Sequence, residues 1–253
     1  MQLLTKYDLT NILFLDIETV SQKETYQEVE EDLRNLWHLK AQNLLRVEEA
    51  DMTDDLAAQA YQDRAAIYAE FGKIVCISVG VVKRTANGEL TLYLKSYYND
   101  DEAELLRNFS SLLEKSFNNP ARHSFCGHNI REFDIPYMCR RFMINQLPIP
   151  EVFDLQGKKP WEVSHIVDTL ELWKFGDFKA YTSLKLLAAV FGFPSPKDDI
   201  DGSQVGRVYW EENNLPRIAK YCEKDVAAVV QLLLKLKYMP ILEPHQIVLK
   251  EAN

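Results

Sequence analysis

The sequence has no long apolar run and no paired cysteine motif, and these absences narrow its class. A membrane-spanning helix needs roughly 20 consecutive apolar residues, whereas the apolar run nearest the N-terminus covers only residues 12–15 and ends at Asp16. A secretory signal also needs a longer apolar core. The 4 cysteines include no C-x-x-C pair, so we expect neither a disulfide framework nor a zinc site. Together these absences predict a cytoplasmic protein without a membrane segment, whose cysteines are buried or idle thiols.

Positive charge is also scarce, because 29 Lys and Arg face 38 Asp and Glu, a net charge of −9. Proteins that bind nucleic acid usually carry a basic footprint, so the total argues against such a partner. The excess is local, however. Residues 21–70 hold 12 acids and 5 bases (−7), and the other 203 residues hold 26 acids and 24 bases (−2). Outside this acidic stretch the net charge therefore does not exclude a nucleic-acid partner.

Glycine and proline are absent from residues 23–70, and apolar residues recur there at three-to-four spacing, which predicts two or more helices. The remaining pattern predicts strands at 11–16, 71–83, 89–98 and 124–126, helices at 101–117, 132–143, 181–191 and 215–236, and loops at 146–163 and 192–206. Asn87-Gly88 is a strong hairpin signal between two of the strands. We therefore expect one α/β domain over residues 1–253. A central mixed sheet would be flanked by helices, with a helical insertion at about 21–70.

Two acids directly follow the apolar run 12–15. Residues two apart on a strand point to the same face, so the carboxylates of Asp16 and Glu18 should converge where the pattern predicts that the strand ends. Open α/β sheets bind their ligands at this edge. A D-x-E pair is frequent by chance, and a solvated strand end is the alternative interpretation.

Acids in two other segments are candidates for the same chemistry. Asp134 falls near the start of a predicted helix, where an aspartate complements the helix dipole equally well. Tyr221 and Asp225 lie at i and i+4 of the predicted helix 215–236, on a stripe that is otherwise apolar. An acid on such a stripe is costly to bury unless it is paired or binds a metal. Asp225 is therefore predicted to be functional.

These segments together resemble the DEDD superfamily of 3′–5′ exonucleases. Asp16 and Glu18, Asp134 within NIREFD, and Asp225 in a Y-x-x-x-D pattern resemble its three motifs, and Tyr221 resembles the mark of its tyrosine subclass (DEDDy). That subclass includes the proofreading domains of family-A and family-B DNA polymerases. The phrases DIET, FDIPY and YCEKDV most resemble a bacterial group of predicted exonucleases related to the family-B proofreading domain. The resemblance implies an RNase H-like fold and hydrolysis of nucleotides from a 3′ end.

The resemblance also implies a metal centre of two ions. Hard carboxylate ligands select Mg²⁺ or Mn²⁺, and two such ions about 4 Å apart stabilise the attacking and leaving oxygens of a displacement at phosphorus. By this resemblance Asp16 bridges the two ions, Glu18 and Asp225 bind the nucleophile-side ion, and Asp134 serves the other ion through water. Tyr221 would orient the attacking water.

Several residues are weaker candidates for contact with substrate. Thr19 and Asn129 could hydrogen-bond the terminal nucleotide, and Phe133 could stack on or wedge a base, although a core position is the commoner fate of an aromatic residue. Asp168 is expected to be a structural acid outside the metal set. Ser183 and Lys185 could approach a phosphate or serve in cap and solvated positions.

The leading prediction is a metal-dependent 3′–5′ exonuclease whose substrate is nucleic acid with a 3′ end, single-stranded DNA being favoured. An exoribonuclease or oligonucleotidase on the same fold is one alternative. A non-catalytic nucleic-acid or partner-binding module is the alternative of another class, although a degenerate site would usually have lost an acid. The insertion at 21–70 could form a lid, a homo-oligomer contact or a surface for a protein partner, and the sequence leaves these three open.

Overall fold

The computed structural model describes residues 6–159, 161–177, 181–194 and 199–250. Its centre is a six-stranded sheet with the order β5-β4-β1-β2-β3-β6. The strands are β1 Ile12–Ser21, β2 Gly72–Arg84, β3 Leu90–Tyr98, β4 Ser124–Gly127, β5 Ile166–Asp168 and β6 Ile247–Leu249. β2 runs antiparallel to β1 and β3, and the other neighbours are parallel. The predicted mixed sheet is thereby confirmed.

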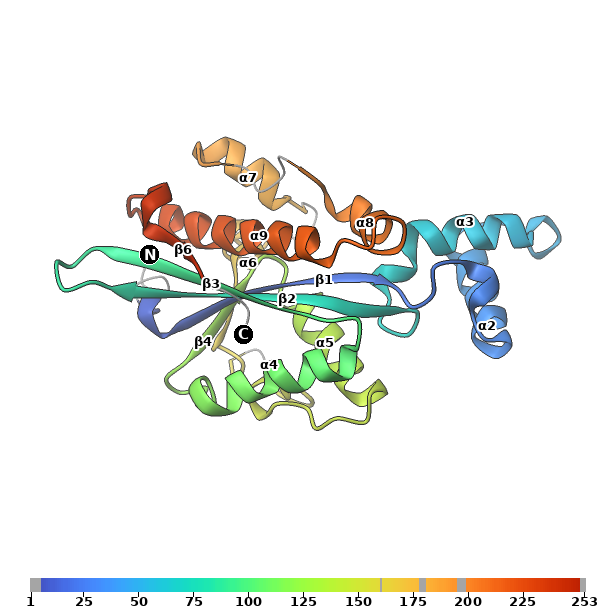
Figure 1. The fold of residues 1–253 in the computed structure, drawn as a ribbon, viewed down its shortest axis with the longest axis horizontal. Coiled ribbons are helices and arrows are strands. Elements are labelled where there is room, and N and C mark those ends of the chain that lie inside the picture. The colour runs from blue at the N-terminus through green and yellow to red at the C-terminus, as the bar shows by residue number, and fades with distance from the viewer. Residues whose placement is uncertain (1–5, 160, 178–180, 195–198, 251–253) are drawn as a thin grey trace.

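Helices cover both faces of this sheet (Figure 1). α4 Glu102–Ser116 and α5 Asp134–Ile144 lie on one face, and α7 Leu184–Phe191, α8 Val205–Trp210 and α9 Leu215–Leu236 lie on the other. α6 Thr169–Lys174 directly follows β5. No helix in the described part of the chain is both long enough and apolar enough to cross a bilayer.

Strand β1 corrects one prediction, because it continues to Ser21 instead of ending at Asp16. The reason is tertiary pairing, since β2 runs beside β1 as far as the pair Ser21–Gly72. On its other side β1 pairs with β4 only as far as Phe14. Asp16 therefore lies inside the strand, just beyond the point where one neighbouring strand has stopped.

The other long elements and the short strand β4 agree with the sequence pattern, whereas most of the short elements were missed. The predicted bounds of α9 match both ends of the observed helix. The observed bounds of β2, β3 and α4 differ from the predicted ones by about one residue. α7 begins at Leu184, not at 181, because the Ser183 side chain caps it by accepting from the Leu186 N–H. The sequence reading missed β5, β6, α6 and most of α8, which have three to six residues each. Such lengths show too little periodicity to be recognised.

The expected helical insertion is present as α2 Glu31–Leu45 and α3 Asp54–Arg64, which extend beyond one end of the sheet (Figure 1). It has a small core of its own around Trp37, whose ring meets that of Tyr61 edge-on at a centroid distance of 5.4 Å. The Trp37 indole N–H donates to the Ala57 carbonyl at 2.9 Å. The insertion is thus an ordered helical pair.

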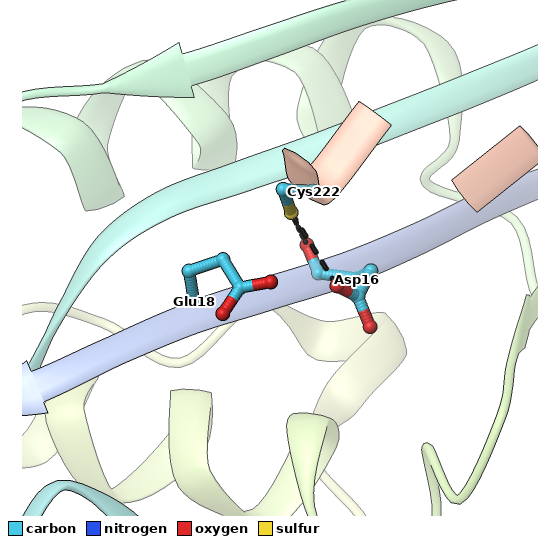
Figure 2. Close-up of side chains that lie close together, drawn as sticks. All are labelled: Asp16, Glu18 and Cys222. Atoms are coloured by element: carbon cyan, nitrogen blue, oxygen red, sulfur yellow. Dashed lines mark hydrogen bonds between the residues drawn. The ribbon is translucent and has the colours of Figure 1, made fainter. Parts of the chain in front are cut away.

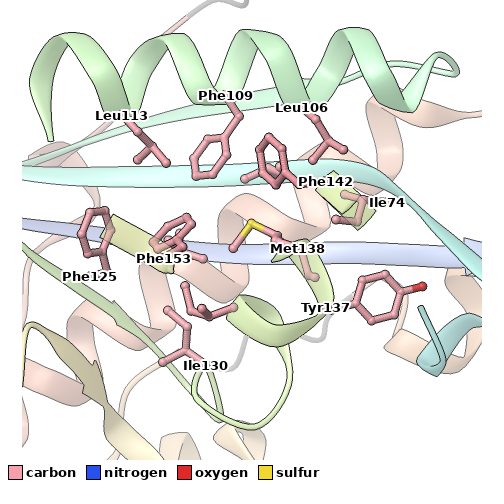
Figure 3. Packing of buried hydrophobic residues seen from close by; sticks show 14 of the residues in the cluster. Ile74, Leu106, Phe109, Leu113, Phe125, Ile130, Tyr137, Met138, Phe142 and Phe153 are labelled. Atoms are coloured by element: carbon pink, nitrogen blue, oxygen red, sulfur yellow. The ribbon is translucent and has the colours of Figure 1, made fainter. Parts of the chain in front are cut away.

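Two hydrophobic layers hold the helices against the sheet. On the α4–α5 face, Figure 3 shows Leu106, Phe109 and Leu113 from α4 packed against Met138 and Phe142 of α5. On the opposite face α9 packs closely on β2, because a Cβ at Gly80 would lie only 2.9 Å from the Val226 side chain. Glycine at position 80 therefore sets how near the α9 residues around 225 come to the sheet.

Candidate active site

Asp16 and Glu18 point to the same face of β1, toward α9, as strand alternation predicts (Figure 2). One carboxylate oxygen from each and the Cys222 sulfur lie within 4.8 Å of one another. The Cys222 thiol donates to the Asp16 carboxylate and to its main-chain carbonyl, both at 3.4 Å. Cys222 is buried as expected of the cysteines, but it is a member of the cluster and not an idle thiol.

A β-bulge lies directly beside Glu18. The β1–β2 register shifts there, since Glu18 pairs with Cys76 and Thr19 with Ile74. Bulges re-aim side chains and are common next to active sites. The Ile74 N–H at the bulge donates to the Glu102 carboxylate at 2.7 Å, and Glu102 is itself buried in an ion pair with Arg141 of α5. The irregularity is therefore held in place by buried polar contacts.

Asp134 reaches β1 from the first residue of α5. Its Oδ1 accepts a hydrogen bond from the Ile17 N–H at 3.1 Å, on the edge that β4 no longer pairs beyond Phe14. The side chain is buried. Asp134 thus satisfies a strand-edge donor and also lies next to Asp16, a position that the helix dipole alone would not require.

Tyr221 and Asp225 complete the group from α9. Tyr221 is buried, and a hydrogen bond joins its side chain to that of Asp225. The charge of Asp225 acts on Asp16, Glu18 and Asp134 alike. The five residues predicted for catalysis therefore lie together, although β1, α5 and α9 are far apart in the sequence.

Crowding and burial raise the pKa of these acids. Burial, then the charges of Asp134 and Asp225, raises the pKa of Asp16 well above its ordinary value. Burial, then Asp16 and Asp225, does the same to the pKa of Glu18. For Asp134 burial raises the pKa to about 7, even though hydrogen bonds from the backbone oppose the rise. In such a group the ionised form of each acid is disfavoured until a cation compensates the charge.

The donor set fits a hard divalent cation. It consists mainly of carboxylate oxygens from three elements that mutually disfavour ionisation, which is the environment that Mg²⁺ or Mn²⁺ stabilises. The Cys222 sulfur is a soft atom close to Asp16 and Glu18. Cys76 of β2, opposite Glu18, is a second thiol near the same acids. Burial raises the pKa of the Cys222 thiol. The thiol therefore keeps its proton and is a hydrogen-bond donor in this structure.

The three predicted substrate contacts border the acids. Thr19 follows Glu18 on β1 and lies beside the Tyr137 hydroxyl. Asn129 has a left-handed backbone (φ 65°) in the turn after β4. Phe133 is half-buried with its ring 5.4 Å from that of Tyr137. Contact between these residues and a substrate stays a prediction.

Asp168 has a structural environment, as expected. Its carboxylate accepts backbone N–H bonds from Asn129 at 2.9 Å, Arg131 at 3.1 Å and Leu170 at 2.9 Å. It thereby caps α6 and fixes the turn that precedes Asp134. Ser183 has a cap position at the start of α7, and an approach of Ser183 or Lys185 to a phosphate stays a prediction.

Sequence reasoning missed one exposed aromatic residue near the acids. Tyr181 falls inside the helix predicted at 181–191, but it precedes α7 in the structure. Burial, then the charges of Asp134, Asp168 and Asp16, raises the pKa of its hydroxyl. A tyrosine three residues before a helix has no pattern that marks it as part of a site.

Comparison with known proteins gives one family and one fold. Residues 67–243, more than half of the chain, match the family described as predicted 3′–5′ exonuclease related to the exonuclease domain of PolB. The matched region contains Asp134, Tyr221 and Asp225 and begins after Asp16 and Glu18. No curated protein matches the chain.

A solved structure similar to this one is the family B DNA polymerase of the hyperthermophilic archaeon Pyrobaculum calidifontis. The TM-score is 0.50 at 18% identity, and the match covers 89% of this chain and 24% of the polymerase chain. The chain thus spans about a quarter of the length of that polymerase. At this identity the likeness shows the fold, which is the expected RNase H-like sheet flanked by helices.

Proposed function

Because the chain belongs to the family of predicted 3′–5′ exonucleases related to the exonuclease domain of PolB, we propose that it is a metal-dependent enzyme of the tyrosine subclass that degrades single-stranded DNA. One observation carries the proposal. The acids of β1, α5 and α9 lie close enough to act on one another's pKa, and those of β1 and α9 act on the pKa of Tyr221 as well. The acids of β1 thus join the site even though the family match does not include β1.

Each acid has a proposed place in a centre of two Mg²⁺ or Mn²⁺ ions. Asp16 would bridge the ions, Glu18 and Asp225 would hold one, and Asp134 would hold the other. When bound, the ions favour the ionised carboxylates and stabilise the attacking and leaving oxygens of an in-line displacement at phosphorus. The raised pKa of Asp16 and Glu18 is the property that makes the site depend on a cation.

Tyr221 is proposed to hold the attacking water. Burial, followed by the charges of Asp225, Glu18 and Asp16, raises the pKa of its hydroxyl, so the phenol stays protonated at neutral pH. A phenol that donates to Asp225 still has lone pairs that accept from water. The side chain therefore suits the orientation of a nucleophile and does not suit a general base.

The charge of the chain supports a polyanionic substrate once it is resolved by region. Outside residues 21–70 there are 26 acids and 24 bases, and removing the four proposed ligands leaves 22 acids and 24 bases, a balance of +2. We expect the strand to approach away from the 21–70 insertion. The four acids and Tyr221 are all present, which disfavours a non-catalytic binding module.

The test incubates 5′-labelled single-stranded DNA, the same sequence as RNA, and a blunt DNA duplex with protein and Mg²⁺ or Mn²⁺. We expect a ladder that shortens from the 3′ end of the single-stranded DNA and is lost with Asp16→Asn or EDTA. Faster degradation of RNA would select the exoribonuclease alternative. Degradation by Asp16→Asn at the wild-type rate would refute the assignment of Asp16 as a metal ligand.

A further inference from the structure

Tyr181 is an exposed aromatic residue that lies beside the acid cluster. The proposed mechanism gives this residue no role. It lies in the segment between α6 and α7, and 68% of its surface is exposed. Its hydroxyl lies in the field of Asp134, Asp168 and Asp16. The ring therefore borders the acid cluster and presents most of its surface to solvent.

The backbone next to Tyr181 is firmly held. Thr182 is buried, and its carbonyl accepts a hydrogen bond from His128 Nε2 at 2.9 Å. The other ring nitrogen of His128 lies 2.9 Å from the Thr169 hydroxyl at the start of α6. One residue further on, Ser183 caps α7. Hydrogen bonds at Thr182 and Ser183 thus fix the chain that presents the Tyr181 ring, and His128 is itself held at Thr169.

The same histidine places this segment against β1. His128 follows Gly127, where a Cβ would lie 3.0 Å from the Leu15 carbonyl oxygen. The turn that holds Thr182 therefore lies against β1 one residue before Asp16. Geometry and electrostatics agree that Tyr181 borders the place where the 3′ end of a substrate would react.

An exposed ring at this place is suited to an unpaired base. Aromatic side chains that line single-strand channels stack on bases with little sequence preference, because every base has a π-face. The Tyr181 hydroxyl is poorly suited to a phosphate clamp, because the charges that act most strongly on it are those of acids. The useful part of this side chain is therefore its ring.

We propose that Tyr181 stacks on an unpaired base near the 3′ end of the strand and thereby favours single-stranded over paired ends. The proposal rests on the proposed function, since it places a nucleic acid at the acid cluster. Loss of one base–aromatic stack should weaken binding about 5- to 150-fold.

The test measures the affinity of a 5′-labelled oligothymidylate by fluorescence anisotropy, with Ca²⁺ in place of Mg²⁺ and intact strands verified on a gel. Wild type is compared with Tyr181→Ala and Tyr181→Phe. Tyr238→Ala is the matched control, because Tyr238 is also aromatic and 78% exposed. It follows the C-terminal end of α9, about 16 Å or more along that helix from Asp225. Each protein is also tested on strands that lack the base of the first, second or third nucleotide from the 3′ end.

We expect Tyr181→Ala to weaken binding about 5- to 150-fold, while Tyr181→Phe and Tyr238→Ala bind about as tightly as wild type. The penalty of Tyr181→Ala should disappear on one of the abasic strands, which a loss of structure alone would not cause. Unchanged binding by Tyr181→Ala, equal weakening by Tyr181→Phe, or the same alanine penalty on every abasic strand would overturn the stack. If wild type hydrolyses DNA with Mg²⁺, these outcomes leave the proposed function intact. Failure of wild type to hydrolyse any strand would refute that function separately.

Discussion

Replacing Asp134 with asparagine should stabilise the metal-free protein above neutral pH. The side chain is 3% exposed, and burial raises its pKa from 3.8 to about 7. Folding at about pH 8 therefore forces a charge into surroundings that disfavour it. An asparagine has nearly the same shape, and its carbonyl oxygen can still accept the Ile17 N–H bond that Asp134 accepts at 3.1 Å. Asp134→Asn removes the charge and keeps the contact.

The raised pKa of Asp134 sets the magnitude and the direction of this effect. A rise from 3.8 to about 7 corresponds to about 4 kcal/mol of differential stability between protonated and ionised forms. Because the native state binds this proton more tightly than the unfolded state, the contribution is fully present below about pH 4 and is lost as the pH rises through about 7. The raised pKa values of Asp16 and Glu18 act in the same direction. Above about pH 8, Asp134→Asn should exceed wild type by up to about 4 kcal/mol.

The assay is urea unfolding in EDTA, followed by tryptophan fluorescence, at about pH 5.5 and about pH 8. Asp168→Asn is the matched control, because Asp168 is also 3% exposed. Its carboxylate accepts three backbone N–H bonds, so losing one acceptor oxygen should cost about 1–3 kcal/mol at both pH values. At alkaline pH, Asp134→Asn should therefore raise the free energy of unfolding, whereas Asp168→Asn should lower it.

Added Mg²⁺ or Mn²⁺ should raise the melting temperature of wild type more at about pH 8 than at about pH 5.5, because fewer protons must leave the ligands. The increase should be smaller in Asp134→Asn. One contrary result is equal stability of wild type and Asp134→Asn in EDTA at both pH values, and another is a variant less stable than wild type at alkaline pH. Either result would show that the ionised Asp134 carboxylate does not destabilise the fold. The reasoning about a cation-dependent cluster would then be wrong.

Three further substitutions probe the site and its supports. Tyr221→Phe should lower kcat about 10- to 100-fold with little change in Mn²⁺ affinity measured by calorimetry, and a loss of that affinity would contradict its proposed role. Arg141→Met leaves the Glu102 carboxylate buried without its ion-pair partner and should cost about 3–5 kcal/mol in urea unfolding; a cost that disappears in the double variant Glu102→Gln/Arg141→Met would identify the unpaired charge as the cause. Gly80→Ala should destabilise by about 1–3 kcal/mol through overpacking against Val226, and unchanged stability by calorimetry would show that α9 can move away from the sheet.

The elements that could be predicted from the sequence are those with a long period or an explicit end signal. The 22-residue helix α9 has a sustained apolar stripe and an asparagine cap, and the β2–β3 hairpin has Asn87-Gly88 at its turn. The end of β1 could not be read from the sequence, because β2 pairs with it across Asp16 and Glu18. Tertiary pairing overrode the local signal of charge.

The candidate site divides in the same way. Strand alternation alone predicts that Asp16 and Glu18 converge. Their meeting with Asp134 depends on where β4 stops and α5 begins, which no local pattern encodes, so the family resemblance had to supply it. Cys222 and Tyr181 were missed for a different reason. A cysteine on a buried helix face and a tyrosine just before a helix look the same in a sequence whether or not acids lie beside them.

One face of α5 explains how the fold tolerates these acids. Asp134, Tyr137 and Arg141 lie at i, i+3 and i+7, which places them on one side of the helix. Asp134 bonds to β1, Tyr137 donates to the Ala66 carbonyl at 2.9 Å, and Arg141 donates to the Ala69 carbonyl at 2.8 Å and pairs with buried Glu102. Repulsion among the acids cannot move α5 away without breaking these buried contacts, which would cost several kcal/mol. The 21–70 insertion ends at this same helix face, so its last residues help to fix the position of Asp134 against β1.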